Sequence, residues 1–152
     1  MDLQTAIYRY CNYQERSHQE ARNKLYELGA YKQQVEELIA ELIEKDILNE
    51  ERYARAIARG KFRILHWGKT KIVQQLRQQR VSEYNIKQAL KEIDIDEYEQ
   101  TAQKLAARKW TEYRSTRHKE HRKSKVYQYL LGKGYESSII SPILNKLVNP
   151  ED

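Results

Sequence analysis

The sequence has few of the residues that crosslink a chain or interrupt its helices. Its 152 residues include one Cys, two Pro and five Gly. A single cysteine cannot form an internal disulfide and has no second Cys to join at a metal site. Scarce glycine and proline remove most turn chemistry, and the strong helix formers that dominate instead favour helix. We therefore expect an all-α protein in a reducing compartment, the cytoplasm.

Long hydrophobic runs are also missing. No stretch approaches the roughly 20 apolar residues that a membrane-spanning helix needs. The N-terminal segment MDLQTAIYRYCNYQE has no positive region followed by an apolar run, as a secretory signal would. We expect neither export nor a membrane partner.

The combinations of residues that carry catalysis or bind cofactors are absent too. No Ser, His and Asp set or Asp-x-Asp pair stands out. His118 and His121 share helical spacing, but the surrounding Lys and Arg would repel a metal ion. The Gly-Lys-Thr at 68–70 resembles the end of a phosphate-binding loop, yet Arg63 occupies the position where that loop needs glycine. We predict no enzyme, no cofactor and no metal, and we interpret Cys11 as a buried, inert thiol.

What the sequence does contain is helical periodicity with clear start and stop signals. Apolar residues at helical spacing predict an opening helix over residues 3–13. Ser17 and Glu20 form a capping-box pattern that begins a second helix, and Gly29 ends it. An apolar stripe predicts a third helix over 35–45, and Asn49 is a candidate cap for a fourth.

The apolar pattern then repeats at offsets of 51 and 54 residues. The three matched series are Ala21, Leu25, Ala30, Val35, Leu38, Ile39, Leu42; Ile72, Leu76, Val81, Ile86, Ala89, Leu90, Ile93; and Val126, Leu130, Tyr135, Ile140, Ile143, Leu144, Leu147. Such a period predicts three tandem three-helix, helix-turn-helix-like repeats in an elongated curved array. The expected division is 1–65 for the opening helix and first repeat, 66–113 for the second repeat and 114–152 for a truncated third.

One residue conflicts with this pattern. Pro142 falls inside the last predicted helix, where proline removes a backbone hydrogen bond. We expect that helix to start late, with Ser141 as its cap and Pro142 in its first turn.

Charge is distributed unevenly along the chain. Residues 1–58 carry eight Lys and Arg against eleven Asp and Glu, residues 59–110 twelve against six, and residues 111–152 eight against five. No acid occurs from 59 to 80. Two basic patches along one array could follow a phosphate backbone or an acidic protein groove, although a solvated helix face is the alternative. The candidate binding residues are Arg59, Lys61, Arg63, Trp67, Lys69, Lys71, Arg77, Arg80, Arg114, Arg117, Lys119, Arg122, Lys123 and Lys125.

Several segments together resemble the RecX family of recombinase regulators. They are SHQEARNKL at 17–25, LNEERYA at 48–54, GKTKIVQQLR at 68–77 with 81–90, and KVYQYLLGKGY at 125–135. The likeness extends from about residue 5 to 148, with two departures. Arg80 stands where the family commonly has Lys-Gly, and Trp67 where a basic residue is more usual.

The resemblance implies three tandem three-helix repeats that bind in the helical groove of the RecA filament on DNA. It implies a regulator that alters the strand-exchange and coprotease activities of RecA. We expect a monomer that modulates, mainly by inhibition, the recombinase, ATPase and coprotease activities of the filament. Two alternatives remain open at this stage. One is a stand-alone DNA-binding module that holds single- or double-stranded DNA, and the other is a helical-repeat scaffold for an unrelated protein.

Overall fold

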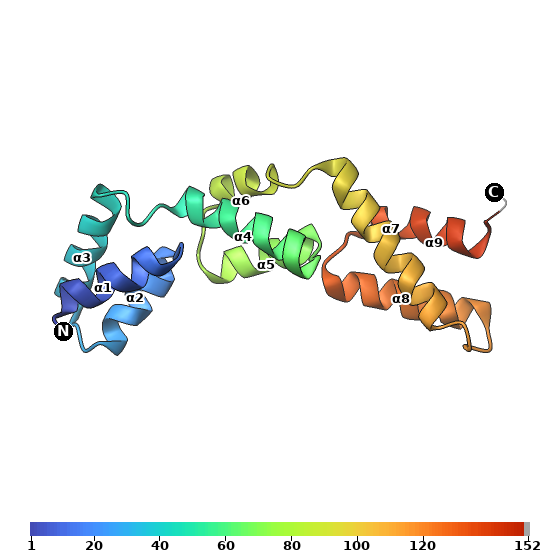
Figure 1. The fold of residues 1–152 in the computed structure, drawn as a ribbon, viewed down its shortest axis with the longest axis horizontal. Coiled ribbons are helices and arrows are strands. Elements are labelled where there is room, and N and C mark those ends of the chain that lie inside the picture. The colour runs from blue at the N-terminus through green and yellow to red at the C-terminus, as the bar shows by residue number, and fades with distance from the viewer. Residues whose placement is uncertain (151–152) are drawn as a thin grey trace. The chain divides into compact units, whose positions relative to one another are not determined.

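The computed structural model describes residues 1–150, which form nine α-helices and no strand (Figure 1). The helices are α1 (Leu3–Tyr13), α2 (His18–Glu27), α3 (Lys32–Glu44), α4 (Glu50–Leu65), α5 (Lys69–Gln78), α6 (Glu83–Leu90), α7 (Ile95–Glu112), α8 (Lys119–Lys133) and α9 (Ser137–Val148). The all-α prediction is confirmed.

Side-chain caps begin several of these helices where the sequence indicates. The Ser17 hydroxyl accepts a hydrogen bond from the Glu20 amide at 2.9 Å, and the Glu20 carboxylate accepts one from the Ser17 amide at 2.9 Å. This is the reciprocal capping box expected at the start of α2. At the start of α4, the side-chain oxygen of Asn49 accepts from the Arg52 amide at 2.9 Å. Both predicted caps are therefore confirmed.

The repeat is also visible in how three helices end. Gly29, Arg80 and Gly134 all have positive φ angles, of 94°, 58° and 102°, and they follow α2, α5 and α8. In each case the amide of the next residue donates to the carbonyl five positions earlier, at 3.0 to 3.1 Å. This is the hydrogen bond of a Schellman motif. Arg80 adopts the left-handed conformation although residues with a side chain disfavour it. The same helix end therefore forms in the middle repeat without glycine.

Burial follows the same register. The first four matched apolar positions are buried in all three copies: Ala21, Ile72 and Val126; Leu25, Leu76 and Leu130; Ala30, Val81 and Tyr135; Val35, Ile86 and Ile140. One supersecondary unit thus recurs three times, with the same faces turned inward.

The chain forms two compact units, whose boundaries fall within α4 and within α5. The first unit contains residues 1–57 and 75–90, and the second contains residues 58–74 and those from 91 onward. In the first unit, α2 packs against α1 and α3. Its core includes Ile7, Leu25, Val35 and Leu42, all with 0% exposure.

In the second unit α7, α8 and α9 pack against one another. Tyr98 of α7, Leu130 of α8 and Leu144 of α9 are fully buried there. The Tyr98 ring lies 5.8 Å from that of Phe62 and 5.1 Å from that of Tyr135, centroid to centroid. Aromatic contacts therefore connect α4, α7 and the turn between α8 and α9.

The expectation for Pro142 is wrong. Helix α9 begins at Ser137, with Glu136 as its N-cap, so the proline lies inside the helix. The first turn is already closed by hydrogen bonds from Ile139 and Ile140 to the Glu136 carbonyl, at 2.9 and 3.0 Å. Burial of Ile140 and Leu144 holds the helix in place despite the proline.

Candidate partner-binding surface

The loop before α5 lies directly against the turn between α8 and α9. The Gly68 amide donates to the Lys133 carbonyl at 2.7 Å, and the Thr70 amide donates to the Gly134 carbonyl at 2.9 Å. A Cβ on Gly68 would lie 2.2 Å from the carbonyl carbon of Gly134. The start of α5, which carries the central candidate cations, is therefore fixed by backbone contact.

Two buried tyrosines complete this junction. The Tyr98 hydroxyl accepts from the Lys69 amide at 2.8 Å and donates to the Glu136 carboxylate. Burial, with a further contribution from Glu136, raises the pKa of Tyr98, so the hydroxyl keeps its proton. The Tyr135 hydroxyl donates to the His66 carbonyl at 2.8 Å.

This geometry explains the Gly-Lys-Thr sequence at 68–70. The three amides donate to a carbonyl, a tyrosine hydroxyl and a second carbonyl of the same chain. A phosphate-binding loop needs such amides to be directed at its ligand. The segment therefore anchors α5 and does not form a nucleotide site.

One lysine from each adjoining helix, α4 and α5, lies near the ring of Trp67. The ammonium of Lys61 lies 5.0 Å from the centroid of the half-buried indole ring, and that of Lys71 lies 4.5 Å from it. Cations at this range are attracted by the ring quadrupole, which favours an ordered position. The result is two positive groups held beside one aromatic ring.

Lys133 joins this group, although the sequence pattern did not mark it. Its ammonium donates to the Leu65 carbonyl at 2.6 Å. Burial and then repulsion from Lys71 lower the pKa of Lys133, because both disfavour the charged form. Only the tertiary contact between the α4–α5 loop and the end of α8 brings this residue to the surface around Trp67.

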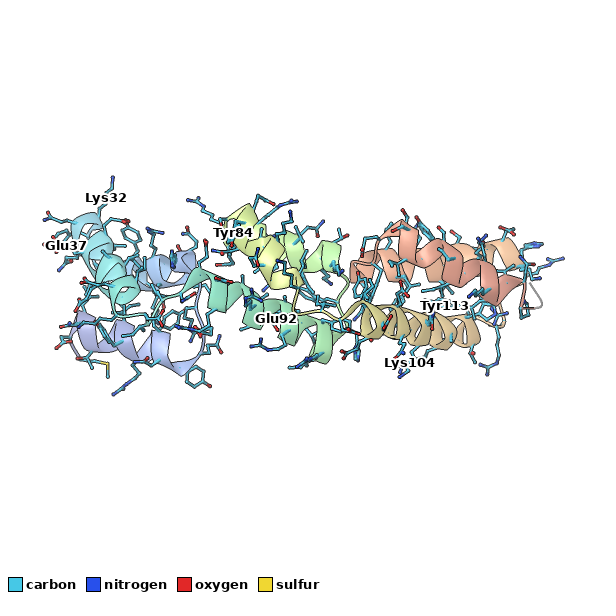
Figure 2. The ribbon with its side chains drawn as sticks, turned by 90° about the horizontal axis from the view of Figure 1, so that it is seen from above. Lys32, Glu37, Tyr84, Glu92, Lys104 and Tyr113 are labelled. Carbon is cyan, nitrogen blue, oxygen red and sulfur yellow. The ribbon has the colours of Figure 1, made fainter. Side chains whose placement is uncertain are left out.

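The absence of acids from 59 to 80 in sequence does not mean their absence in space. The Arg59 guanidinium forms an ion pair with Glu92 at 3.3 Å. Figure 2 draws the side chains along the ribbon and labels Glu92 among them. Arg63, by contrast, is exposed near the end of α4.

Arg77 and Arg80 belong to the first unit, whereas the other candidates belong to the second. The Arg77 guanidinium donates two hydrogen bonds to the Glu83 carboxylate, at 2.8 and 3.2 Å. These bonds lower the pKa of Glu83 and raise that of Arg77. Arg80 is exposed, and its backbone ends α5.

The candidate cations from Arg114 to Lys125 form a second cluster, and aromatic rings lie beside two of them. The Arg122 guanidinium lies 3.8 Å from the Trp110 ring centroid and donates to the Trp110 carbonyl. The Lys125 ammonium lies 5.4 Å from the Tyr113 ring and 3.3 Å from the Thr116 hydroxyl. These two cations therefore hold the α7–α8 connection as well as contributing charge.

The remaining members lie around the same connection. Arg114 donates to the Thr111 carbonyl at 3.2 Å, and Lys123 to the Asn145 side chain at 3.4 Å. Arg117 and Lys119 are exposed, and so are His118 and His121. The cluster presents positive charge suited to phosphate or carboxylate groups.

Among residues 1–150 no group of three or more His, Cys, Asp and Glu could hold a metal ion. Cys11 is buried, and burial raises the pKa of its thiol to about 11, so it is protonated and unreactive at neutral pH. No helix in the described part of the chain is both long enough and apolar enough to span a membrane.

The fold and surface define a tandem three-helix-repeat protein whose ordered cations suit binding. Two family models match the chain: the second three-helix domain of RecX over residues 49–90, and the third three-helix domain of RecX over residues 96–144. Together they cover more than half of the chain. The first model covers α4, α5 and α6, and the second covers α8 with most of α7 and α9. Each of these domains begins one helix earlier than the corresponding repeat counted from Ser17. This chain belongs to the RecX family.

Relatives and solved structures agree. The chain is 31% identical over 137 residues to "Regulatory protein RecX" of Clostridium perfringens, covering 90% of this chain and 64% of the relative. The protein of that name from Limosilactobacillus reuteri is 29% identical, and the match covers 94% of this chain and 54% of the relative. The one from Prosthecochloris aestuarii is also 29% identical, and the match covers 91% of this chain and 89% of the relative. The chain thus spans about half to two thirds of the length of the first two.

The structural similarity covers nearly all of the chain. A crystal structure of regulatory protein RecX matches with a TM-score of 0.83 and 28% identity, covering 95% of this chain and 72% of the other. The structure of RecX from Lactobacillus salivarius matches with a TM-score of 0.83 and 26% identity, covering 95% and 94%.

Proposed function

We propose that this chain binds the RecA nucleoprotein filament in the cytoplasm and modulates, mainly by inhibition, its recombinase, ATPase and coprotease activities. The observation that carries the proposal is membership of the RecX family, with two of the family's three-helix domains recognised. Relatives that match most of this chain bear the name regulatory protein. Regulation by binding needs no active site.

The surface around Trp67 supports a binding role. Lys61 and Lys71 beside this ring are held in place before any partner arrives, so binding costs less side-chain entropy. Charged contacts of this kind raise association rates and select acidic partners. A protein held across successive RecA protomers would change filament growth, disassembly or access to the groove without turnover of its own.

The test measures RecA-driven ATP hydrolysis and strand exchange with this protein at substoichiometric amounts. We expect both activities to fall, because one bound regulator affects neighbouring protomers. Unchanged hydrolysis and strand exchange across the full range of added protein would contradict the proposal.

A stand-alone DNA-binding module is the second candidate, and the cation and ring pairs favour it. Arg122 on Trp110 and Lys125 beside Tyr113 combine charge with aromatic surface, as proteins that hold single strands do. This function requires tight DNA binding without recombinase and a steep loss of affinity with salt. Filament binding that persists where DNA alone does not bind would decide for the first proposal.

A further inference from the structure

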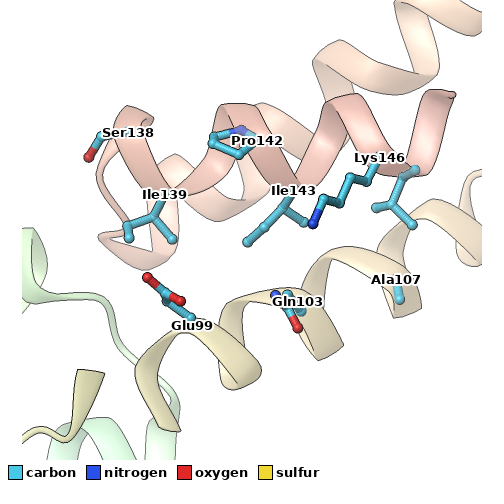
Figure 3. A pocket seen from close by; sticks show the side chains of 9 residues that line it. Glu99, Gln103, Ala107, Ser138, Ile139, Pro142, Ile143 and Lys146 are labelled. Carbon is cyan, nitrogen blue, oxygen red and sulfur yellow. The ribbon is translucent and has the colours of Figure 1, made fainter. Parts of the chain in front are cut away.

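A groove of about 510 Å³ lies between α7 and α9 (Figure 3), and none of the candidate basic residues described above lines it. Helix α9 lines it with Ile139, Ile143 and Leu147, at four-residue spacing, and with Pro142. Helix α7 contributes the small side chain of Ala107. The three members of the α9 stripe are half-buried, and Pro142 is exposed.

This stripe is additional to the one that forms the core. Helix α9 already buries Ile140, Leu144 and Val148 within its own unit. A helix at a protein surface ordinarily needs one apolar stripe and turns a polar face to water. Helix α9 therefore carries more apolar surface than its own unit covers.

The corresponding groove of the first unit has different chemistry. It lies between α1 and α3, and four of its lining positions correspond to those of the α7–α9 groove at an offset of 105 residues. Positions 34, 37, 38 and 41 hold Gln, Glu, Leu and Glu, whereas positions 139, 142, 143 and 146 hold Ile, Pro, Ile and Lys. The same architectural feature is thus polar and acidic in one unit and apolar in the other, so the fold itself does not require the apolar lining.

Pro142 strengthens this contrast. Proline has no amide hydrogen, so the Ser138 carbonyl cannot receive the usual helical bond from position 142. Both residues line the groove. A residue that weakens its helix and faces a groove is better explained by contact with a partner than by folding.

Two opposite charges lie along the groove. Glu99 lies at the end near Ile139, and Lys146 extends back from the C-terminal half of α9, so that its ammonium lies beside Ile143 (Figure 3). A helix has a partial positive charge at its N-terminus and a partial negative charge at its C-terminus. The complementary occupant is a helix whose N-terminus meets Glu99 and whose C-terminus meets Lys146, running parallel to α9.

The size of the groove separates a partner helix from a second copy of this chain. Nine residues line it, well below the about 20 to 30 residues per side of a standard stable interface. Such a groove is sufficient for the apolar face of one helix within a larger contact. We propose that the α7–α9 groove receives one amphipathic helix of the recombinase, oriented parallel to α9. This inference rests on the proposed function.

The test converts this groove to the chemistry of its counterpart in the double variant Ile139→Gln with Pro142→Glu. Glu is a far better helix former than Pro, so we expect the helical circular dichroism signal and thermal stability to be retained. Affinity for a RecA filament on single-stranded DNA should fall about tenfold, because an anchoring contact is lost. The loss should persist at moderate salt, since apolar contacts are not screened.

The matched control is Gln34→Ala with Glu37→Ala in the first groove, which should bind the filament like the wild type. If the wild type binds and the groove variant binds equally well, this inference is overturned while the proposed function stands. If the wild type itself does not bind, the proposed function fails and the inference falls with it. A wild-type dimer that the groove variant abolishes, seen by sedimentation, would identify a second copy as the occupant and also overturn the inference.

Discussion

Gly68 and Gly134 approach so closely that neither position has room for a side chain. A Cβ on Gly68 would lie 2.2 to 2.4 Å from backbone atoms of Gly134 and Tyr135, and one on Gly134 would lie 2.4 Å from the Lys71 Cβ. Glycine is required here because two backbones touch, and at Gly134 also because φ is positive. The contact sets how the start of α5 meets the α8–α9 turn.

Gly68→Ala should therefore destabilise the protein by about 1 to 3 kcal/mol, the usual cost of overpacking. The measurement is the free energy of unfolding from urea titration. Gly132→Ala is the matched control, because no atom lies within 4 Å of its added Cβ. That helical position should gain about 0.5 to 1 kcal/mol. Equal effects of the two substitutions would show that the close contact does not exist in solution.

Tyr98→Phe tests the polar part of the same junction. The change removes the hydroxyl that accepts from the Lys69 amide and donates to Glu136. It should cost about 1 to 3 kcal/mol of unfolding free energy, because partly buried groups lose their partner. Tyr84→Phe, at a position 68% exposed, should leave stability almost unchanged. A Tyr98→Phe protein as stable as the wild type would argue against the network.

Most of the helical fold was predictable because its determinants are local. Ser17 and Glu20 satisfy each other's amides within one turn, and Gly29 ends the helix that they begin. The late start predicted for α9 was wrong, since local preference placed Pro142 in a first turn. Burial of Ile140 and Leu144, a tertiary effect, outweighs that preference.

The candidate surface was less predictable, because sequence distance says little about which charges meet. Glu92 reaches Arg59 from outside the acid-free segment. Lys133 approaches Lys71 from a helix far along the chain, and burial, followed by repulsion from Lys71, lowers the pKa of Lys133. No periodic pattern encodes either contact; both depend on packing between helices.

Cys11 should react slowly with iodoacetamide in the folded protein. Burial raises its pKa from the ordinary value of 9.0 to about 11, which leaves about a hundredfold fewer thiolates at pH 8. Labelling followed by mass spectrometry should therefore be at least about a hundredfold slower than in urea. The native rate should keep rising above pH 9, because the folded thiol ionises only near 11. Equal rates with and without urea would mean that the thiol is accessible.

Lys69→Glu with Lys71→Glu tests the charges at the start of α5. The Lys69 ammonium lies 4.9 Å from the Tyr98 ring centroid, and the Lys71 ammonium lies 4.5 Å from the Trp67 ring centroid. The Lys69 amide, which bonds to Tyr98, is retained in the variant. Each lost cation and ring contact costs only about 0.5 to 1 kcal/mol at exposed sites, so the circular dichroism spectrum should not change. Affinity for the RecA filament should fall at least about tenfold, since two attractive charges become repulsive.

The control for this variant is Lys104→Glu with Arg108→Glu, which makes the same change in net charge on exposed positions of α7. If only total charge matters, both variants should lose affinity equally. In both, the difference from the wild type should then disappear as added salt screens the charges. If Lys69 and Lys71 form the contact, the control should stay close to wild-type affinity. If the Lys69 and Lys71 variant binds as tightly as the wild type, the partner contact must lie on another part of the chain.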